Sequence, residues 1–339
     1  MRYLFILLFA LTCLSYAKPQ LKFNATGQFK IMQLTDTHYD YFNQDIPQTL
    51  NMVTNFLQWE KPDFVAFTGD LITGYLWNGT ADWFYDRWSP HAALLTKFGV
   101  PWGYALGNHD GEADLDRRQC VELDMTAPFS LSKTGPAYMG NSTFYVQVYD
   151  KFGKKPLWNL WFFDTGSQVC YGIPGWGCLT HEAVQWYISN EKGLPGLAFM
   201  HIPLDEYLQM YNLQATAGFY EEIMACSSLN TGLFSAFKAK GMVKGVGCGH
   251  NHEIDLEGYF AGLYLAFGRK SGYGSYGPAP DMQRGVRMWV INEDSSFYTY
   301  IRQEDGSIMQ RTINDLSNHT AIQDYCMWAQ YNLPNYHIL

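Results

Sequence analysis

The sequence predicts an α/β sandwich built from two sheets. Up to about residue 250, short apolar runs alternate with amphipathic helical stretches, a pattern typical of βαβ units. A cluster of polar residues follows each apolar run. From residue 253 the apolar runs follow one another without intervening helices, which predicts a second, more antiparallel sheet packed on the first.

The individual elements follow from the periodicity of the apolar residues. An amphipathic pattern from Leu50 to Leu57 predicts a helix that ends before Pro62, and another helical stretch runs through Trp83 and Leu94. The expected strands are 29–34, 64–67, 102–106, 157–163, 197–200 and 241–246, and later 253–267, 286–292 and 297–301. Ligands of such sheets gather beyond the carboxyl ends of the strands, which is where the polar clusters fall.

Composition describes a chain that folds around a large core. Of its 339 residues, 47% are hydrophobic, 17% aromatic and only 16% charged, which excludes a disordered protein. No internal repeat or low-complexity linker interrupts it, so a single domain over 18–339 is expected. The formal net charge of -9, with no run rich in Lys and Arg, argues against binding to a nucleic-acid backbone.

The first 17 residues have the pattern of a signal peptide. Arg2 supplies the positive charge, 4–14 is apolar, and Ser15-Tyr16-Ala17 is a small-residue cleavage site. The apolar stretch is shorter than the ~20 residues that span a bilayer, and no later segment qualifies as a transmembrane helix. We therefore expect a mature chain that begins near Lys18 and is secreted or held in the lumen of a secretory or endolysosomal compartment.

Cysteines and sequons fit that route. Six cysteines remain after Cys13 leaves with the signal peptide, and an even number suggests disulfides. Cys170 and Cys178 form the one pair that the spacing favours, while Cys248 is expected to be either a buried thiol or a disulfide partner. Possible N-glycosylation sequons begin at Asn24, Asn78, Asn141 and Asn318.

Seven potential metal ligands stand at predicted strand ends. The Gly249-His250-Asn251-His252 stretch can aim two imidazoles at adjacent ions. Carboxylate, amide and imidazole groups suit Fe, Zn and Mn, and one carboxylate can bridge two ions. Any one motif is equally explained by helix caps and scattered polar residues, but that explanation is improbable for five motifs in order. The seven are Asp36, His38, Asp70, Asn108, His201, His250 and His252.

These motifs together resemble the calcineurin-like metallophosphoesterase superfamily. The motifs are Asp36-x-His38, Gly69-Asp70, Gly107-Asn108-His109-Asp110, a lone His201 and Gly249-His250-x-His252. The stretches 199–207 and 267–277 resemble the purple-acid-phosphatase-like branch. The resemblance covers about 29–301 and implies a four-layer α/β/β/α sandwich of two mixed sheets flanked by helices.

The resemblance also implies a role for each motif residue. Asp36, His38, Asp70 and His252 would hold one metal, and Asp70 would bridge to a second held by Asn108, His201 and His250. His109 would face the substrate phosphate and protonate the leaving oxygen, since the pKa of histidine lies close to working pH. Asp110 has two interpretations, orienting His109 or capping the next helix.

One departure from the purple acid phosphatases concerns a metal ligand. Those enzymes carry a tyrosinate three residues after the Gly-Asp aspartate, where this chain has Thr73, and they lack the histidine present here as His38. Tyr75 is nearby but out of register. A His-for-Tyr exchange at one metal leaves Fe/Zn, Fe/Fe, Zn/Zn and Mn open as the metal pair, with Fe(III)/M(II) and two divalent ions both allowed.

Three weaker signals remain. The stretch 272–277 fits G-x-G-x-x-G, but Pro278 and Pro280 follow where a helix should open, so a glycine-rich loop near the metals is favoured over a dinucleotide site. Arg269 and Lys270 either bind substrate phosphate or form an exposed solvated pair. A cluster of aromatic residues either lines a substrate entrance or belongs to the core: Trp77, Trp83, Phe84, Tyr85 and Trp88.

The sequence thus predicts a secreted dinuclear-metal phosphohydrolase, most simply a phosphomonoesterase acting on small molecules or phosphoproteins. In the chemistry that the resemblance implies, a metal-bridging hydroxide attacks phosphorus in line. A phosphodiesterase of nucleotide or sphingomyelin type is the close alternative. A non-catalytic phosphate-binding protein is the remote one, because such a protein would be expected to lose ligands. The physiological substrate and the oligomeric state are not predicted.

Overall fold

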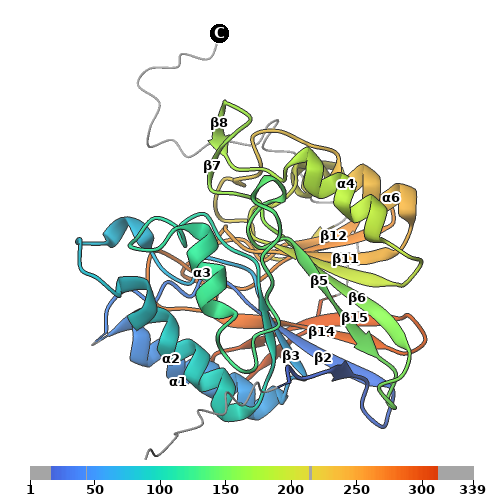
Figure 1. Ribbon diagram of the computed structural model, residues 1–339, viewed down its shortest axis with the longest axis horizontal. Coiled ribbons are helices and arrows are strands. Elements are labelled where there is room, and N and C mark those ends of the chain that lie inside the picture. Colours follow the sequence, from blue (N-terminus) through green and yellow to red (C-terminus); the bar gives the residue numbers. More distant parts are fainter. Residues whose placement is uncertain (1–16, 43, 214–215, 312–339) are drawn as a thin grey trace, which may run out of the picture.

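The computed structural model describes residues 17–42, 44–213 and 216–311. Two mixed sheets lie face to face, and helices cover the outer face of each (Figure 1). The four-layer α/β/β/α sandwich expected from the sequence is confirmed. The predicted signal peptide, apart from Ala17, lies outside the described residues, as do Asn318 and Cys326. Within the described ranges, no helix is both long and apolar enough to cross a bilayer.

The six-stranded sheet has the order β16-β15-β14-β2-β3-β4. β2, β3 and β4 run parallel, whereas β14, β15 and β16 are antiparallel additions. Its strands are β2 Gln28–Leu34, β3 Phe64–Phe67, β4 Trp102–Tyr104, β14 Gly285–Asn292, β15 Phe297–Gln303 and β16 Ile308–Met309. Its outer face is covered by α1 Asp45–Glu60, α2 Trp83–Phe98 and α3 Arg117–Asp124.

The eight-stranded sheet has the order β1-β5-β6-β9-β11-β13-β12-β10. β6, β9, β11 and β13 are parallel and form its centre. Its strands are β1 Leu21–Lys22, β5 Phe144–Tyr149, β6 Pro156–Phe163, β9 Gly196–Met200, β10 Thr216–Ala217, β11 Val243–Cys248, β12 Glu257–Phe260 and β13 Leu263–Phe267. Its outer face is covered by α4 His181–Asn190, α5 Asp205–Leu213 and α6 Leu233–Lys240.

Two short 3-10 helices and a hairpin complete the described part. The 3-10 helices are η1 Gly74–Leu76 and η2 Ala137–Met139, and the hairpin pairs β7 Gln168–Cys170 with β8 Ile173–Trp176. Asp116 caps α3 through a reciprocal capping box with Gln119, which fixes where that helix begins after the loop from β4.

The later strands do not form a sheet of their own, which corrects the expectation from the sequence. β12 and β13 join the eight-stranded sheet, whereas β14 pairs antiparallel with β2 from the beginning of the chain. An apolar run identifies a strand but does not identify the strand that it pairs with. β14 and β2 are more than 250 residues apart in the chain, so nothing local to either segment indicates their pairing.

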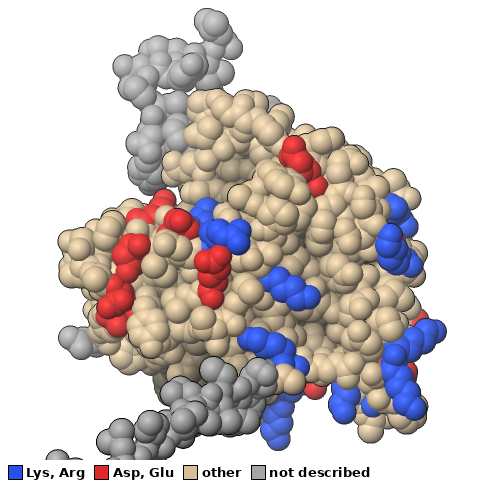
Figure 2. Space-filling view, in the orientation of Figure 1, with Lys and Arg blue, Asp and Glu red and all other residues tan. Residues whose placement is uncertain are grey.

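The core lies in three apolar layers. The middle layer, between the sheets, includes Phe29, Phe64, Phe199 and Trp289, all buried. Parallel strands with both faces covered need near-continuous apolar sequences, which explains the high hydrophobic content. Figure 2 shows acidic side chains gathered on the side of the molecule that carries α2 and α3, and Lys and Arg along the opposite edge, across the middle of the view and next to the acidic group.

Candidate dinuclear metal centre

Loops from both sheets bring the predicted ligands together. Asp36 and His38 follow β2, Asp70 follows β3 and Asn108 follows β4, all in the six-stranded sheet. The other three, His201, His250 and His252, follow β9 and β11 in the eight-stranded sheet. The carboxyl ends of these parallel strands meet at one edge of the sandwich, so residues far apart in sequence surround one place.

Four of the predicted ligands adopt a left-handed backbone. The φ angles are 52° at Asp36, 44° at His38, 52° at Asp70 and 76° at His250. Such a conformation costs on the order of 1–3 kcal/mol for a residue with a side chain and persists only where surrounding contacts impose it. Backbone hydrogen bonds between the first two loops help to impose it: Asp36 N–H to Gly69 O, His38 N–H to Asp70 O, and Tyr39 N–H to Leu71 O.

Glycine is required where these loops touch. A Cβ atom on Gly107 would lie 2.1 Å from Asp70 Oδ1, and one on Gly249 would lie 2.0 Å from Thr35 Oγ1. Real Cβ atoms essentially never approach other atoms so closely. The glycines beside Asn108 and His250 are therefore explained by the close approach of neighbouring ligand loops.

The first group of donor atoms comes from Asp36, His38 and His252. His252 Nε2 lies 3.4 Å from Asp36 Oδ1 and 3.1 Å from His38 Nε2, and His38 Nε2 lies 3.7 Å from Asp70 Oδ2. All of these side chains are buried. The potential ligand atoms of Asp36, His38 and His252 lie within 4.8 Å of one another, which is the spacing of ligands around one ion.

The second group comes from Asp70, His201 and His250, with Asn108 beside them. His201 Nε2 lies 3.2 Å from Asp70 Oδ2, 2.9 Å from Asn108 Oδ1 and 3.2 Å from His250 Nδ1. The potential ligand atoms of the three titratable residues again lie within 4.8 Å of one another. Asp70 Oδ2 approaches histidines of both groups, as a bridging carboxylate would.

The hydrogen bonds of the imidazoles show that this arrangement suits cations. His201 Nδ1 faces the Thr68 carbonyl at 2.7 Å, and His252 Nδ1 faces the Tyr276 carbonyl at 2.9 Å. A carbonyl only accepts, so each Nδ1 carries a proton, and the opposite nitrogen of a neutral ring then directs a lone pair toward the group. His201 Nε2 instead faces two acceptor oxygens, from Asp70 and Asn108, so without an ion it carries a proton, and a metal ion would take the place of that proton.

The pKa shifts of the buried histidines also favour a bound cation. Burial lowers the pKa of His250 to about 3, and burial together with Lys270 lowers that of His38 well below its usual value. Burial also opposes a proton on His201, but the Asp70 carboxylate outweighs it and raises the pKa to about 9. The carboxylates thus concentrate negative charge in a dry site, which favours a bound cation.

His109 lies at the rim of the two groups. Its ring contacts that of His38, with 5.9 Å between centroids, and its backbone N–H donates to Asp70 Oδ1 at 2.9 Å. Its Nδ1 lies 2.6 Å from Glu112 Oε2. Burial alone would lower the pKa of His109, but Asp70 and the hydrogen bond to Glu112 raise it to about 9. Glu112 was missed in the sequence, although its i,i+3 spacing from His109 was the available signal.

Asp110 neither hydrogen-bonds the His109 ring nor caps the next helix, whose N-cap is Asp116, so both of its predicted roles are wrong. Its carboxylate is fully buried and accepts three backbone N–H groups. The donors are Asp70 at 3.1 Å, Leu71 at 2.8 Å and Gly107 at 2.6 Å. Asp110 therefore ties the loop after β4 to the loop after β3, and it holds the backbone of Asp70 in place.

Arg269 and Lys270 do not face the site, and both predicted interpretations of this pair are wrong. Neither is an exposed solvated residue, because both side chains are buried. Arg269 forms an ion pair with Asp255 at 3.0 Å, and Lys270 Nζ donates to the carbonyls of Asp36 at 2.9 Å and Gly274 at 2.8 Å. Their donors point into the protein: Lys270 supports the loop after β2 and Arg269 is engaged by Asp255, so neither side chain is free to meet substrate.

Three aromatic rings touch the histidines of the site. Tyr75 packs edge-on against His109, Tyr276 stacks on His252 with 4.1 Å between centroids, and Trp176 meets His250 edge-on at 4.4 Å. Tyr75 and Tyr276 are 62% and 53% exposed, so both offer surface to a ligand. Of the aromatic cluster noted in the sequence, Trp83, Phe84 and Trp88 belong to the core, whereas Trp77 and Tyr85 are exposed.

The glycine-rich stretch 272–277 forms a loop beside the metal ligands. A Cβ atom on Gly272 would lie 1.8 Å from the Thr37 carbonyl oxygen, and one on Gly274 would lie 1.8 Å from that of His38. The loop therefore packs directly against the backbone that carries Asp36 and His38. No helix opens after it, which agrees with the expectation that it is not a dinucleotide site.

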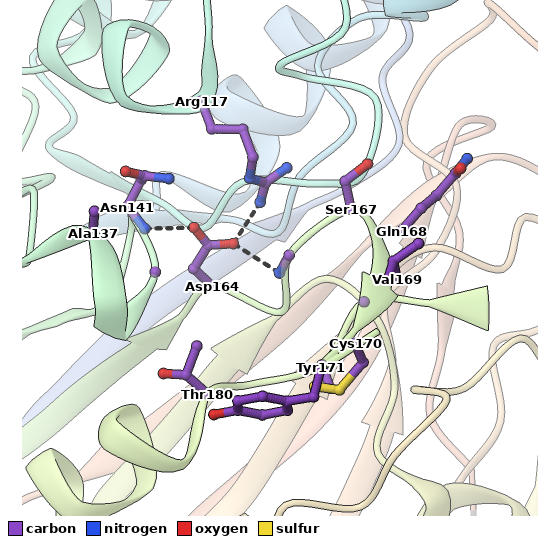
Figure 3. A pocket seen from close by; sticks show the side chains of 14 residues that line it. Arg117, Ala137, Asn141, Asp164, Ser167, Gln168, Val169, Cys170, Tyr171 and Thr180 are labelled. Atoms are coloured by element: carbon purple, nitrogen blue, oxygen red, sulfur yellow. Dashed lines mark hydrogen bonds and ion pairs between the residues drawn. A yellow bond between two sulfur atoms is a disulfide. The ribbon is translucent and has the colours of Figure 1, made fainter. Parts of the chain in front are cut away.

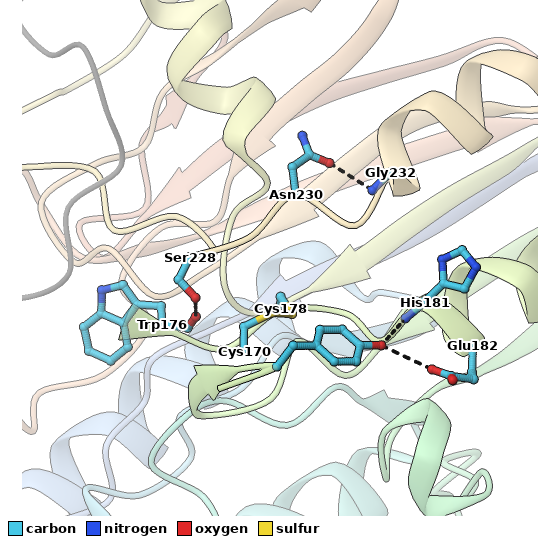
Figure 4. Close-up of a disulfide and its surroundings, with 9 residues drawn as sticks. Cys170, Trp176, Cys178, His181, Glu182, Ser228, Asn230 and Gly232 are labelled. Carbon is cyan, nitrogen blue, oxygen red and sulfur yellow. Dashed lines mark hydrogen bonds between the residues drawn. A yellow bond between two sulfur atoms is a disulfide. The ribbon is translucent and has the colours of Figure 1, made fainter. Parts of the chain in front are cut away.

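The predicted Cys170–Cys178 disulfide is present and closes the β7–β8 hairpin (Figure 4). The Trp176 carbonyl accepts from Ser228 N–H and Oγ, so the hairpin that carries this tryptophan to His250 is anchored on a second loop. Cys120 and Cys248 are buried free thiols, which decides between the alternatives left open for Cys248.

A pocket of about 260 Å³ lies beside the centre, between this hairpin and the loop before β5 (Figure 3). Asp164 at its base pairs with Arg117 and accepts Asn141 N–H at 2.6 Å. Ser167, also in its wall, donates to the Asn108 carbonyl at 2.8 Å, which connects the pocket to a predicted metal ligand. Asn141, the first residue of a sequon, therefore lines this pocket, whereas the sequon residues Asn24 and Asn78 are exposed.

Sequence comparison connects these motifs to known proteins. The model of the calcineurin-like phosphoesterase family matches residues 29–254, which contain all seven predicted ligands. A relative from Arabidopsis thaliana, named probable inactive purple acid phosphatase 29, is 30% identical over 81% of this chain and 79% of its own. Phosphatase DCR2 of Saccharomyces cerevisiae is 29% identical over 81% of this chain and 54% of its own.

Solved structures share the fold. A dimetal phosphatase from Danio rerio superposes with a TM-score of 0.55 over 80% of this chain and 98% of its own, at 13% identity. A similarity of that level extends to the architecture alone. The edge of the sandwich where the two donor groups meet is thus built on a scaffold that is shared with a dimetal enzyme.

Proposed function

This chain belongs to the calcineurin-like phosphoesterase family, in its purple-acid-phosphatase-like branch, and from that premise we propose that it is a secreted dinuclear-metal phosphomonoesterase. The observation that carries the proposal is the pair of buried donor groups, Asp36–His38–His252 and Asp70–His201–His250. One group alone would suit a structural ion. Two groups that share the Asp70 carboxylate suit hydrolysis of a phosphoester.

We assign Asp36, His38, Asp70 and His252 to one ion, and Asn108, His201, His250 and again Asp70 to the other. Two ions held there would polarise the phosphoryl oxygens and supply a hydroxide nucleophile for in-line attack. The protein contributes the preorganised ligand geometry, in which buried loops fix each side chain before substrate arrives.

His109 is the residue we assign to the leaving group. It is partly exposed at the rim, touches His38, and is held by Glu112 through Nδ1. Its Nε2 is then the nitrogen available to donate a proton to a departing alkoxide, which is a poor leaving group without one. The raised pKa of His109 favours the protonated form that this task requires.

A phosphodiesterase remains the second candidate because of one observation. Arg269 and Lys270, which the sequence suggested as phosphate contacts, are buried and engaged elsewhere. These two cations are therefore not available to neutralise the second negative charge of a phosphomonoester. A phosphodiester carries only one negative charge.

The deciding experiment compares matched aryl phosphate monoester and diester substrates with one metal-replete, deglycosylated sample of the mature chain. Faster monoester cleavage supports the proposal, and faster diester cleavage replaces it with the second candidate. Turnover of neither substrate by a sample that holds two ions per chain would favour a non-catalytic phosphate-binding protein, in keeping with the words probable inactive in the relative's name. Secretion is tested separately, by determining the N-terminus of the exported chain, which should lie near Lys18.

A further inference from the structure

Thr73 occupies the position where the purple acid phosphatases carry a tyrosinate ligand, and here it contacts the histidine that takes the tyrosinate's place. Its hydroxyl lies 2.7 Å from Nδ1 of His38. Both side chains are buried, so water does not compete for this hydrogen bond. Thr73 belongs to the loop after β3 and His38 to the loop after β2, so the contact also joins two ligand loops.

Asp40 holds Thr73 from the other side. Its Oδ1 accepts the backbone N–H of Thr73 at 3.1 Å. Its Oδ2 accepts the backbone N–H of Ser275 at 3.0 Å, which ties in the glycine-rich loop. Asp40 is buried and lies outside both donor groups.

The donor and acceptor roles follow from this chain of contacts. His38 can bind an ion at the first donor group through Nε2 only if that nitrogen keeps its lone pair. The Nδ1 of the neutral ring then carries the proton, and the Thr73 hydroxyl oxygen accepts it. That leaves the lone pair of His38 on Nε2, the nitrogen that lies 3.1 Å from His252 Nε2 and faces the first donor group.

We propose that Thr73 and Asp40 are positioning residues that hold His38 as a neutral, Nε2-donating metal ligand. This inference rests on the proposed dinuclear centre, and it explains the departure from the tyrosinate pattern. The residue at the tyrosinate position no longer binds the ion but supports a histidine that reaches the centre from the neighbouring loop. Carboxylate or hydroxyl partners that orient a ligating histidine typically contribute ~10–100-fold to metal affinity.

The test measures zinc affinity by chelator competition and zinc content per chain. Thr73→Val keeps the shape and removes the hydroxyl, and one of the two ions should bind ~10–100-fold more weakly. Thr73→Ser restores the hydroxyl and should recover most of the affinity. Thr54→Val is the matched control, because it removes a hydroxyl that bonds only within α1, to the Leu50 carbonyl. Unchanged affinity for both ions in Thr73→Val overturns the proposal.

A second measurement uses the wild-type protein and needs a variant only to assign the resonance. In metal-free protein labelled with ¹⁵N at histidine, the His38 resonance, assigned by its absence in His38→Gln, should show the proton on Nδ1. A proton on Nε2 overturns the proposal. Wild-type protein that holds two ions but turns over no phosphoester would refute the proposed activity and leave the role of Thr73 standing. Wild-type protein that binds neither zinc, iron nor manganese would refute both.

Discussion

Glu112→Gln offers the sharpest test of how the reaction proceeds, because it leaves both donor groups untouched. The Glu112 carboxylate bonds His109 Nδ1 at 2.6 Å, and the two side chains are 25% and 20% exposed. A charge-assisted hydrogen bond contributes ~1.5–3 kcal/mol when well shielded. Partial exposure places this one at the lower end, since solvent screens such pairs.

A loss of ~1.5 kcal/mol corresponds to ~10-fold in rate. That loss should depend on the leaving group. An alkyl phosphate needs a proton on its departing oxygen, whereas a nitrophenyl phosphate barely does. We expect Glu112→Gln to lower kcat ~10-fold on the alkyl ester and at most ~3-fold on the nitrophenyl ester, while His109→Asn should show a larger difference of the same kind, because general-acid catalysis contributes ~10²–10⁴-fold.

The assay measures kcat and KM for both esters at fixed pH, with metal content determined on every sample. Glu122→Gln is a suitable control, because that residue pairs with Arg118 on the surface of α3 and contacts no site residue. Equal losses on the two esters at full metal content would refute the assignment of His109 as the acid. They would indicate that the His109–Glu112 pair serves only to shape the loop.

Other predictions concern stability and metals. Burial lowers the pKa of His91 to about 4, whereas an unfolded histidine titrates near 6.5. The stabilisation by neutral His91 is therefore fully present above pH ~6.5 and is lost as the pH falls. About 2 kcal/mol of unfolding free energy should be lost between pH 7 and pH 5. Denaturant titrations should find a smaller loss in His91→Gln. Chelation should abolish turnover and lower Tm, and zinc at 1,000 times its Kd should restore ~4 kcal/mol. Replacing Cys170 and Cys178 by Ser should cost ~2–3 kcal/mol by loop-closure entropy and lower Tm, as calorimetry would show.

The sequence predicted which side chains would come together because their chemistry and their place in the fold coincide. Asp36, Asp70 and His201 each follow a parallel strand, and parallel strands bring their carboxyl ends to one edge regardless of their separation in the chain. The partners of β14 could not be predicted in the same way. Its apolar run fits a buried strand in either sheet, and only the packing of the whole chain places it beside β2.

The supporting residues escaped prediction for a different reason. Asp110 is adjacent to His109, and Glu112 is three residues away, so both are plausible partners for the imidazole. The choice depends on the turn after Asn108, which points the Asp110 carboxylate back at three backbone N–H groups and leaves Glu112 beside the ring. Arg269 and Lys270 show the same limit, because a charge in sequence does not reveal whether its side chain turns outward.

Three buried carboxylates outside the ligand groups explain how the strained loops persist. Asp110 accepts N–H groups from the loops after β3 and β4, Asp40 accepts those of Thr73 and Ser275, and Asp164 accepts those of Gly166 and Asn141. Each such bond to a charged acceptor contributes ~1.5–3 kcal/mol, the same order as the cost of one left-handed residue. Asp110 therefore holds the backbone of Asp70, one of the four left-handed residues, and Asp40 and Asp164 hold neighbouring loops, without any contribution from a metal. It follows that the donor groups should be organised before ions bind, so that metal removal should lower stability without unfolding the loops.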